Sequence, residues 1–124
     1  MNEPSLFAPA NLGSLKLKNR IVMAPMTRNR AVEANTPNAL MAEYYAQRSG
    51  AGLIITEGTS PSPNGAGYAR IPGLWTKEQV AAWKSVTARV HERGGRIFAQ
   101  LMHAGRVGHA ANLPKDAKLL APSA

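Results

Sequence analysis

Short apolar runs alternate with helix-like stretches along this chain, and this alternation restricts its possible folds more than any other feature. The runs "NRIVMAPM" (19–26), "GLIITEG" (52–58) and "RIFAQLM" (96–102) have the length and continuity of buried strands. Residues 37–49 and 76–93, between them, have apolar side chains at helical spacing. We therefore expect the order strand, helix, strand, helix, strand, which favours right-handed crossovers and a parallel α/β sheet.

Local signals predict where the helices begin and end. Thr36 followed by Pro37 predicts the start of the first helix, in which Leu40, Tyr44 and Gln47 are spaced by helical steps. A capping box predicts the second helix, because "TKEQ" (76–79) places glutamine three residues after threonine. "GG" (94–95) predicts its end. The apolar face expected on this helix consists of Val80, Trp83, Val86 and Val90.

Polar groups stand at the ends of all three expected strands. Thr27 offers a hydroxyl, Gly58 a backbone that a planar ligand could approach, and Gln100 a donor and an acceptor on one side chain. Ligands of parallel α/β folds collect at the carboxyl ends of the strands, in an open sheet and in a barrel alike. We expect a flat heterocycle at Gln100; the alternative is that its amide bonds to neighbouring backbone.

Composition limits the class of protein. The 124 residues, 44% of them hydrophobic and 18% charged, suffice for one globular domain. No apolar run reaches the roughly 18–20 residues that cross a bilayer, and no secretory signal is recognisable, so we expect a cytoplasmic protein without membrane contact. The absence of cysteine excludes disulfides, thiolate nucleophiles and Cys-based zinc sites.

A formal charge of +8 makes an anion- or nucleic-acid-binding domain one alternative. The basic residues are spread along the chain, however, with few aromatic side chains among them to stack on bases. We therefore expect no nucleic-acid partner.

Other candidate residues favour structural roles. His103 and His109 have loop-like spacing without a carboxylate cluster, which favours hydrogen bonding over metal binding, and His91 is expected in solvent. Glu57 could be a buried acid, but pairing with backbone or a basic neighbour is favoured. "GAGYAR" (65–70) has Arg70 where a dinucleotide fingerprint needs glycine. We expect no metal.

Four ordered motifs resemble the amino-terminal third of the Old Yellow Enzyme family: "LFAPANLGSLKLKNRIVMAPMTR", "EYYAQRSGAGLIITEGT", "GYARIPGLW" and "GGRIFAQLMHAGR". Members of that family are flavin-dependent reductases built on a (β/α)8 TIM barrel. The resemblance implies that residues 1–124 form an incomplete β-α-β-α-β portion of such a barrel, strands 1 to 3 with their connecting helices.

The resemblance also implies an FMN site at the strand ends. Pro25 and Met26 would offer backbone and apolar contacts to the isoalloxazine, and Thr27 would donate its hydroxyl toward the flavin C4 carbonyl. Gly58 would bring its backbone near the same edge, and Gln100 would pair with the pyrimidine side of the ring.

Substrate binding is implied for Tyr68 and for Met102, which stands where the family often has tryptophan. The family transfers hydride from NADPH or NADH, through flavin N5, to the C=C bond of activated alkenes such as enones and nitroalkenes. Its substrate-polarising pair, proton-donating tyrosine and phosphate-binding loops match nothing in residues 1–124, so we expect no catalytic residue here.

Three parallel strands cannot close an eight-stranded barrel. We therefore expect a fragment that needs the missing carboxyl-terminal barrel portion as its partner and is inactive alone. The rival hypothesis is a non-catalytic remnant that associates with another chain through its open sheet edge.

Overall fold

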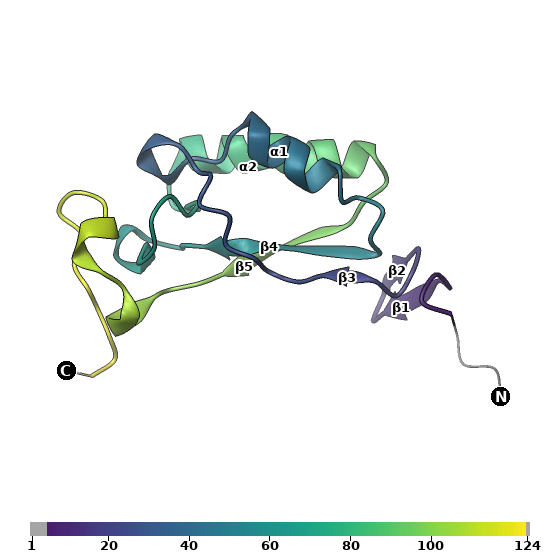
Figure 1. Ribbon diagram of the computed structural model, residues 1–124, viewed down its shortest axis with the longest axis horizontal. Helices are drawn as coiled ribbons and strands as arrows, with labels where there is room; N and C mark the ends of the chain where they lie inside the picture. The colour runs from purple at the N-terminus through teal and green to yellow at the C-terminus, as the bar shows by residue number, and fades with distance from the viewer. Residues whose placement is uncertain (1–4, 124) are drawn as a thin grey trace.

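A parallel sheet covered on one face by two helices forms the centre of the molecule (Figure 1), for which a computed structural model describes residues 5–123. In chain order the elements are β1 (Ala10–Leu12), β2 (Leu15–Leu17), β3 (Val22–Met23), α1 (Ala39–Ala46), β4 (Leu53–Thr59), α2 (Lys77–Glu92) and β5 (Ile97–Leu101). Single 3₁₀ turns lie at Glu33–Asn35, Pro63–Gly65, Gly105–Val107 and Ala110–Asn112. From β3 onward, the predicted order of strands and helices is confirmed.

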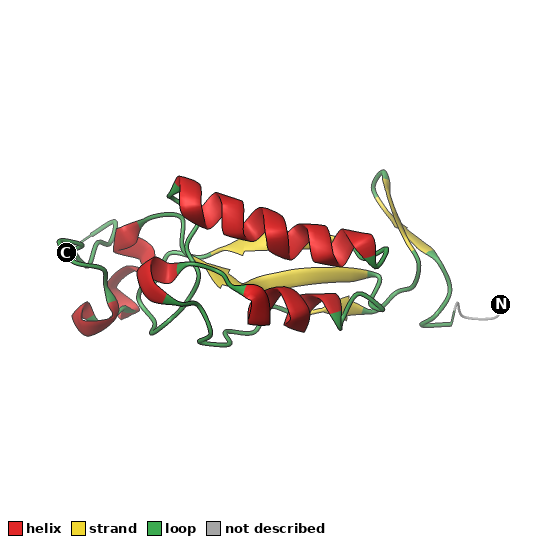
Figure 2. Cartoon of the chain, turned by 90° about the horizontal axis from the view of Figure 1, so that it is seen from above, coloured by secondary structure: helices red, strands yellow, loops and turns green. Residues whose placement is uncertain are grey.

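The sheet has the strand order β3–β4–β5, and both strand pairs are parallel. Val22 pairs with Leu53, and Ile54 pairs with Ile97. Parallel neighbours need a crossover, and α1 and α2 supply the two crossovers on the same face of the sheet (Figure 2). The predicted parallel α/β arrangement is therefore confirmed.

The core lies between the helices and the sheet. The indole of Trp83 packs against the ring of Tyr45, with 6.3 Å between centroids, and its Nε1 donates to the Gly73 carbonyl at 3.1 Å. Burying a large apolar side chain contributes about 1.5–3 kcal/mol, so this layer stabilises the sheet. The buried residues of the cluster are Ala31, Met41, Ala42, Tyr45, Ile54, Trp83, Val86 and Val90.

Helix α2 begins and ends as predicted. The Thr76 hydroxyl accepts from the Gln79 backbone N–H at 3.1 Å, and the Gln79 side chain accepts from the Thr76 N–H, also at 3.1 Å. Gly94, at φ +69°, turns the chain back after the helix. Val80 was expected on the apolar face of this helix but is 39% exposed. Gln79 lies on the buried face instead, and its side-chain amide donates to the Ala34 carbonyl at 2.9 Å.

Helix α1 differs from its prediction in start and in face. Asn38, not Thr36, is the cap, and its side chain accepts from the Met41 N–H at 3.0 Å. The buried face contains Met41 and Tyr45, whereas Leu40 is 62% exposed. Apolar residues surround this helix, so spacing alone did not identify the face that meets the sheet.

The first strand is shorter than predicted, and an element before it was not predicted. Only Val22–Met23 pairs with β4, because the chain turns away near Pro25, which has no N–H to donate. The hairpin of β1 and β2 turns at Gly13, whose φ is +58°. It lies at the amino-terminal end of β3 (Figure 1), away from the carboxyl ends of the strands.

Within residues 5–123, no helix covers the face of the sheet opposite α1 and α2, which we call the bare face (Figure 1). Side chains alternate along strands, so Val22 and Phe98 point away from Met23 and Ile97, which pack against the core. Val22 is 48% exposed and Phe98 50%. In the described residues, no helix is long and apolar enough to span a membrane.

Candidate functional site

The carboxyl ends of β3, β4 and β5 meet at one end of the sheet. After β3, the Arg28 backbone N–H donates to the Glu57 carboxylate on β4 at 3.3 Å. After β5, the Met102 N–H donates to the Thr59 carbonyl at 2.9 Å. The three segments that contain the predicted cofactor residues are thus held side by side.

Gly58 and Gln100 are direct neighbours across β4 and β5. A β-bulge precedes Gly58, since Ile55 pairs with Phe98 but Gly58 pairs with Gln100. Beside the bulge, the backbone N–H of Gln100 donates to the Thr56 hydroxyl at 3.0 Å. Bulges often re-aim side chains beside functional sites, and sequence patterns do not show them.

The amide of Gln100 is half-buried at the strand end, less enclosed than predicted. It lies two residues after Phe98 and therefore on the bare face of the sheet. Within residues 5–123, no hydrogen bond involves its side chain, so the alternative of pairing with neighbouring backbone is not realised there. Both halves of the amide remain open to a ligand on that face.

Gly58 has a structural reason to be glycine. A Cβ added to it would lie 2.6 Å from Cε of Met102 and 2.7 Å from its Sδ. The methionine thioether therefore packs directly on Gly58, in the space where a planar ligand was predicted to approach. Met102 and Gly58 are brought together, so the predicted substrate and cofactor residues share one small surface.

The remaining predicted residues lie at the edges of this surface. Pro25 is half-buried, while Met26 and Thr27 are exposed on the segment after β3. Tyr68 is 45% exposed in the loop after β4. Its neighbour Gly67 packs closely against the segment after β5, which places Tyr68 at the same end of the sheet.

Glu57 is buried and fully bonded, with 1% exposure. The Tyr45 hydroxyl donates to its Oε1 at 3.0 Å and accepts from its backbone N–H at 2.8 Å, while Arg28 donates to Oε2. Burial raises the pKa of Glu57, and bonds from Tyr45 and Arg28 oppose that rise. The expected pairing of Glu57 with backbone is confirmed by the bond from Arg28. Tyr45 was not predicted as a partner. Burial also raises the pKa of the Tyr45 hydroxyl.

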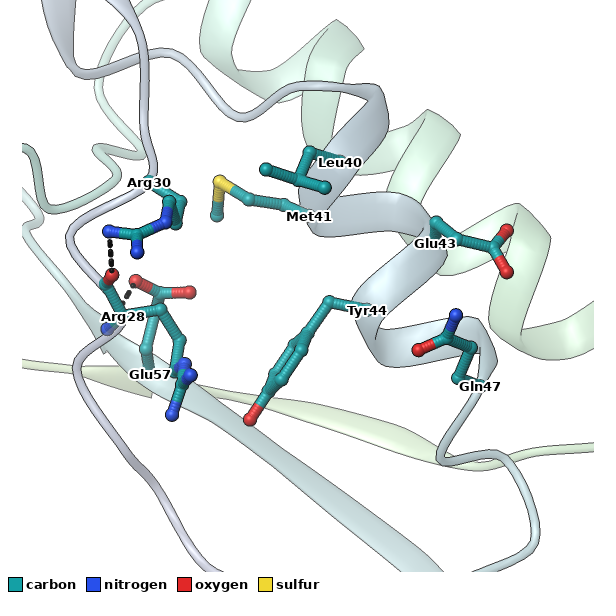
Figure 3. A pocket seen from close by; sticks show the side chains of 8 residues that line it. All are labelled: Arg28, Arg30, Leu40, Met41, Glu43, Tyr44, Gln47 and Glu57. Carbon is teal, nitrogen blue, oxygen red and sulfur yellow. Dashed lines mark hydrogen bonds between the residues drawn. The ribbon is translucent and has the colours of Figure 1, made fainter.

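A pocket of about 200 Å³ lies on the helix side of the sheet, between α1 and the segment after β3 (Figure 3). The guanidinium carbons of Arg28 and Arg48 lie 4.9 and 3.7 Å from the Tyr44 ring centroid. None of the predicted cofactor or substrate residues lines this pocket. Its lining consists of Arg28, Arg30, Leu40, Met41, Glu43, Tyr44, Gln47 and Glu57.

The histidines have the structural roles predicted for them. Nδ1 of His103 accepts from the Gly105 N–H at 3.1 Å, and Nδ1 of His109 accepts from the Ala111 N–H at 3.2 Å. His91 is exposed on α2. Over the described part of the chain, no three His, Cys, Asp or Glu side chains are grouped as a metal site requires.

Comparison with known families decides the relationship. A sequence model of the NADH:flavin oxidoreductase / NADH oxidase family matches residues 5–124. The chain belongs to this family. The Old Yellow Enzyme resemblance is thereby confirmed, and NADH:flavin oxidoreductase relatives occur among curated proteins and solved structures alike.

Similar NADH:flavin oxidoreductases include plant and protozoan proteins. The chain is 46% identical over 113 residues to 12-oxophytodienoate reductase 7 of Oryza sativa subsp. japonica, covering 90% of this chain and 28% of the relative. It is 39% identical over 119 residues to a probable flavin mononucleotide-dependent alkene reductase of Leishmania infantum, covering 96% and 33%. The chain thus spans about a third of the length of these relatives.

Solved structures of the family share the fold of the described residues. Morphinone reductase superposes with a TM-score of 0.92 at 50% identity, covering 99% of this chain and 33% of the other. The old yellow enzyme homologue of Zymomonas mobilis gives 0.82 at 53% identity, covering 85% and 30%. These relatives are barrel enzymes, and the sheet of the present chain corresponds to part of such a barrel.

Proposed function

We propose that this chain supplies part of the FMN site of an ene-reductase that uses NADPH or NADH to reduce the C=C bond of activated alkenes, such as enones and nitroalkenes. The grouping of Gly58, Gln100 and the segment ending at Thr27, at three neighbouring carboxyl strand ends, carries the proposal. Family membership supports it, because several relatives are flavin-dependent reductases.

The polar groups on this surface fit a flavin. A flavin is flat, and its pyrimidine edge displays carbonyl acceptors beside an N–H donor. The Gln100 amide can serve both kinds of group, and the Thr27 hydroxyl can donate to a carbonyl. Pro25 and Met26 add apolar and backbone surface on the same segment.

In this proposal the cofactor carries out the redox chemistry, and the chain binds and orients the cofactor. Bound FMN supplies the hydride relay between the nicotinamide and the alkene. The chain's own residues bind and orient: Gln100 and Thr27 fix the ring edge, and Met102 and Tyr68 bound the substrate space. Polarisation of the substrate oxygen and proton donation belong to residues outside 1–124, so the isolated chain is proposed to be inactive.

The rival hypothesis, a non-catalytic remnant, also has an observation in its favour. Val22 and Phe98 leave apolar surface uncovered on the bare face, and β3 and β5 are edge strands. Such a surface could bind another chain without any flavin.

Loss of the Gln100 amide tests the proposed FMN site. In the chain completed with the remainder of the morphinone reductase barrel, Gln100→Ala should weaken FMN binding by about 1–3 kcal/mol, since the buried flavin edge loses its partner. Flavin fluorescence titration measures this change in Kd, which is about 5- to 150-fold. Gln47→Ala, an exposed amide on the helix side, is the matched control. Equal affinities of the two variants would remove Gln100 from the site.

A further inference from the structure

The bulge in β4 determines where Glu57 points. Strict alternation after Ile54, which faces the helices, would place Glu57 on the bare face of the sheet. The register shift between Ile55 and Gly58 breaks that alternation. The carboxylate instead reaches Tyr45 on α1, on the helix side. The bulge therefore turns Glu57 toward the helices and Gly58 toward the bare face, the reverse of what strict alternation would give.

Both carboxylate oxygens and the backbone N–H of Glu57 are hydrogen-bonded. Tyr45 donates to Oε1 at 3.0 Å and accepts from the Glu57 N–H at 2.8 Å, which closes a small ring of bonds. The Tyr45 side chain is itself fully buried in the core, so α1 provides a rigid anchor. The second oxygen, Oε2, remains for the backbone N–H of Arg28.

This last bond holds the segment that follows β3. Pairing between β3 and β4 ends at Met23, and within the described residues the backbone of 24–27 makes no hydrogen bond to β4. The Arg28 N–H, 3.3 Å from Glu57, is the next attachment along the chain. Thr27 directly precedes that attachment, and Gly58 directly follows Glu57. One carboxyl group thus sets the separation of two residues on the proposed FMN surface.

We infer that Glu57, anchored by Tyr45, is a positioning residue: it fixes the Pro25–Thr27 segment against Gly58 and so sets how the Thr27 hydroxyl meets the flavin. The inference rests on the proposed function for its flavin part. Glu57 touches neither cofactor nor substrate and acts only through the backbone of Arg28.

Hydrogen exchange on the 124-residue chain tests the attachment without any cofactor. In Glu57→Gln and in Tyr45→Phe, the Arg28 amide, followed within the peptide spanning 24–30, should exchange about tenfold faster, which corresponds to a loss of about 1.4 kcal/mol. The peptide spanning 51–56 should change less than about twofold, since the β4 ladder is retained. Unchanged exchange in 24–30, or equal acceleration of both peptides, would overturn the positioning role.

The flavin part is tested by the reduction potential in the completed barrel. Glu57→Gln should shift the FMN potential in the same direction as Thr27→Ala, whereas Glu92→Gln, on the exposed end of α2, should not. Accelerated exchange with an unshifted potential would support Glu57 as the attachment of the 24–27 segment but would refute its effect on the flavin. Failure of the unsubstituted barrel to bind FMN would refute the proposed function instead.

Discussion

The two faces of the sheet differ in how their apolar side chains are covered. On the helix face, Ile54 is fully buried beneath α1 and α2, together with Trp83 and Val86. On the other face, Val22 and Phe98 remain about half exposed at 48% and 50%. Helices α1 and α2 therefore cover one face of the sheet, while the proposed site lies on the other face, which no helix covers within residues 5–123.

Truncation on each face should show the contrast most strongly. Trp83→Ala should lower the free energy of unfolding by about 3–5 kcal/mol, because a packed, hydrogen-bonded indole leaves a cavity. Phe98→Ala should lower it by less than about 1 kcal/mol, since its ring already meets solvent. Urea unfolding of both variants at equal protein concentration measures the difference. Similar losses would show that the bare face is packed in solution.

Charge placed on the bare face should change association. Exposed apolar surface and open strand edges predict that the 13.2 kDa chain elutes as oligomers in size-exclusion chromatography with light scattering. Val22→Lys with Phe98→Lys should shift it toward monomer. Leu40→Lys, at a 62% exposed site on the helix side, is the control and should leave the oligomers unchanged. An equal shift toward monomer in Leu40→Lys would contradict association through the bare face.

The buried carboxyl between the two faces should make stability depend on pH. Burial raises the pKa of Glu57 above its ordinary value of 4.5, so the folded chain binds its proton more tightly than the unfolded chain. The stabilisation from this tighter proton binding is therefore present below pH 4.5 and is lost as pH rises through the pKa of the folded chain. The Arg28 and Tyr45 groups that face the carboxyl limit the loss.

Urea unfolding across this pH range isolates the Glu57 contribution. As pH rises, the unsubstituted chain should lose free energy of unfolding relative to Glu57→Gln, by about 1.4 kcal/mol for each unit by which folding raises the pKa. Glu92→Gln, at the exposed end of α2, serves as the control. Parallel pH profiles for the chain and Glu57→Gln would contradict a perturbed carboxyl.

The smallest expected effect concerns the edge of the bare face. Thr27→Ala should lower the potential of bound FMN by about 20 mV, equivalent to about 1 kcal/mol, because the hydroxyl favours the electron-rich reduced ring. Stopped-flow measurements should then show slower reduction by the nicotinamide, with the alkene half-reaction spared or faster. Unaltered rates in both halves would remove this hydrogen bond from the account.

The features predicted from sequence are those that local patterns determine. The strand runs at 52–58 and 96–102 and the capping box of Thr76 and Gln79 depend on neighbours a few residues away, and the structure confirms them. The strand-end location of Gly58 and Gln100 followed from parallel topology.

The features that were missed depend on contacts between distant residues. The buried face of α1 is set by Trp83 on α2, so the periodicity of Leu40 and Tyr44 could not show it. The bulge before Gly58 depends on register with β5, and the bond from Tyr45 to Glu57 follows from that bulge. Tyr45 lies 12 residues before Glu57 on a different element, so no local pattern indicated that they pair.

Complementation tests whether residues 1–124 supply part of an FMN site. The 124-residue chain is mixed with the remainder of the morphinone reductase barrel as a separate polypeptide, and flavin absorbance and NADPH-dependent enone reduction are followed. We expect bound FMN and turnover in the mixture, while the chain alone should match the enzyme-free control. Enone reduction by the chain alone, as a 13.2 kDa monomer, would contradict both the incomplete bare face and the assignment of catalysis to residues outside 1–124.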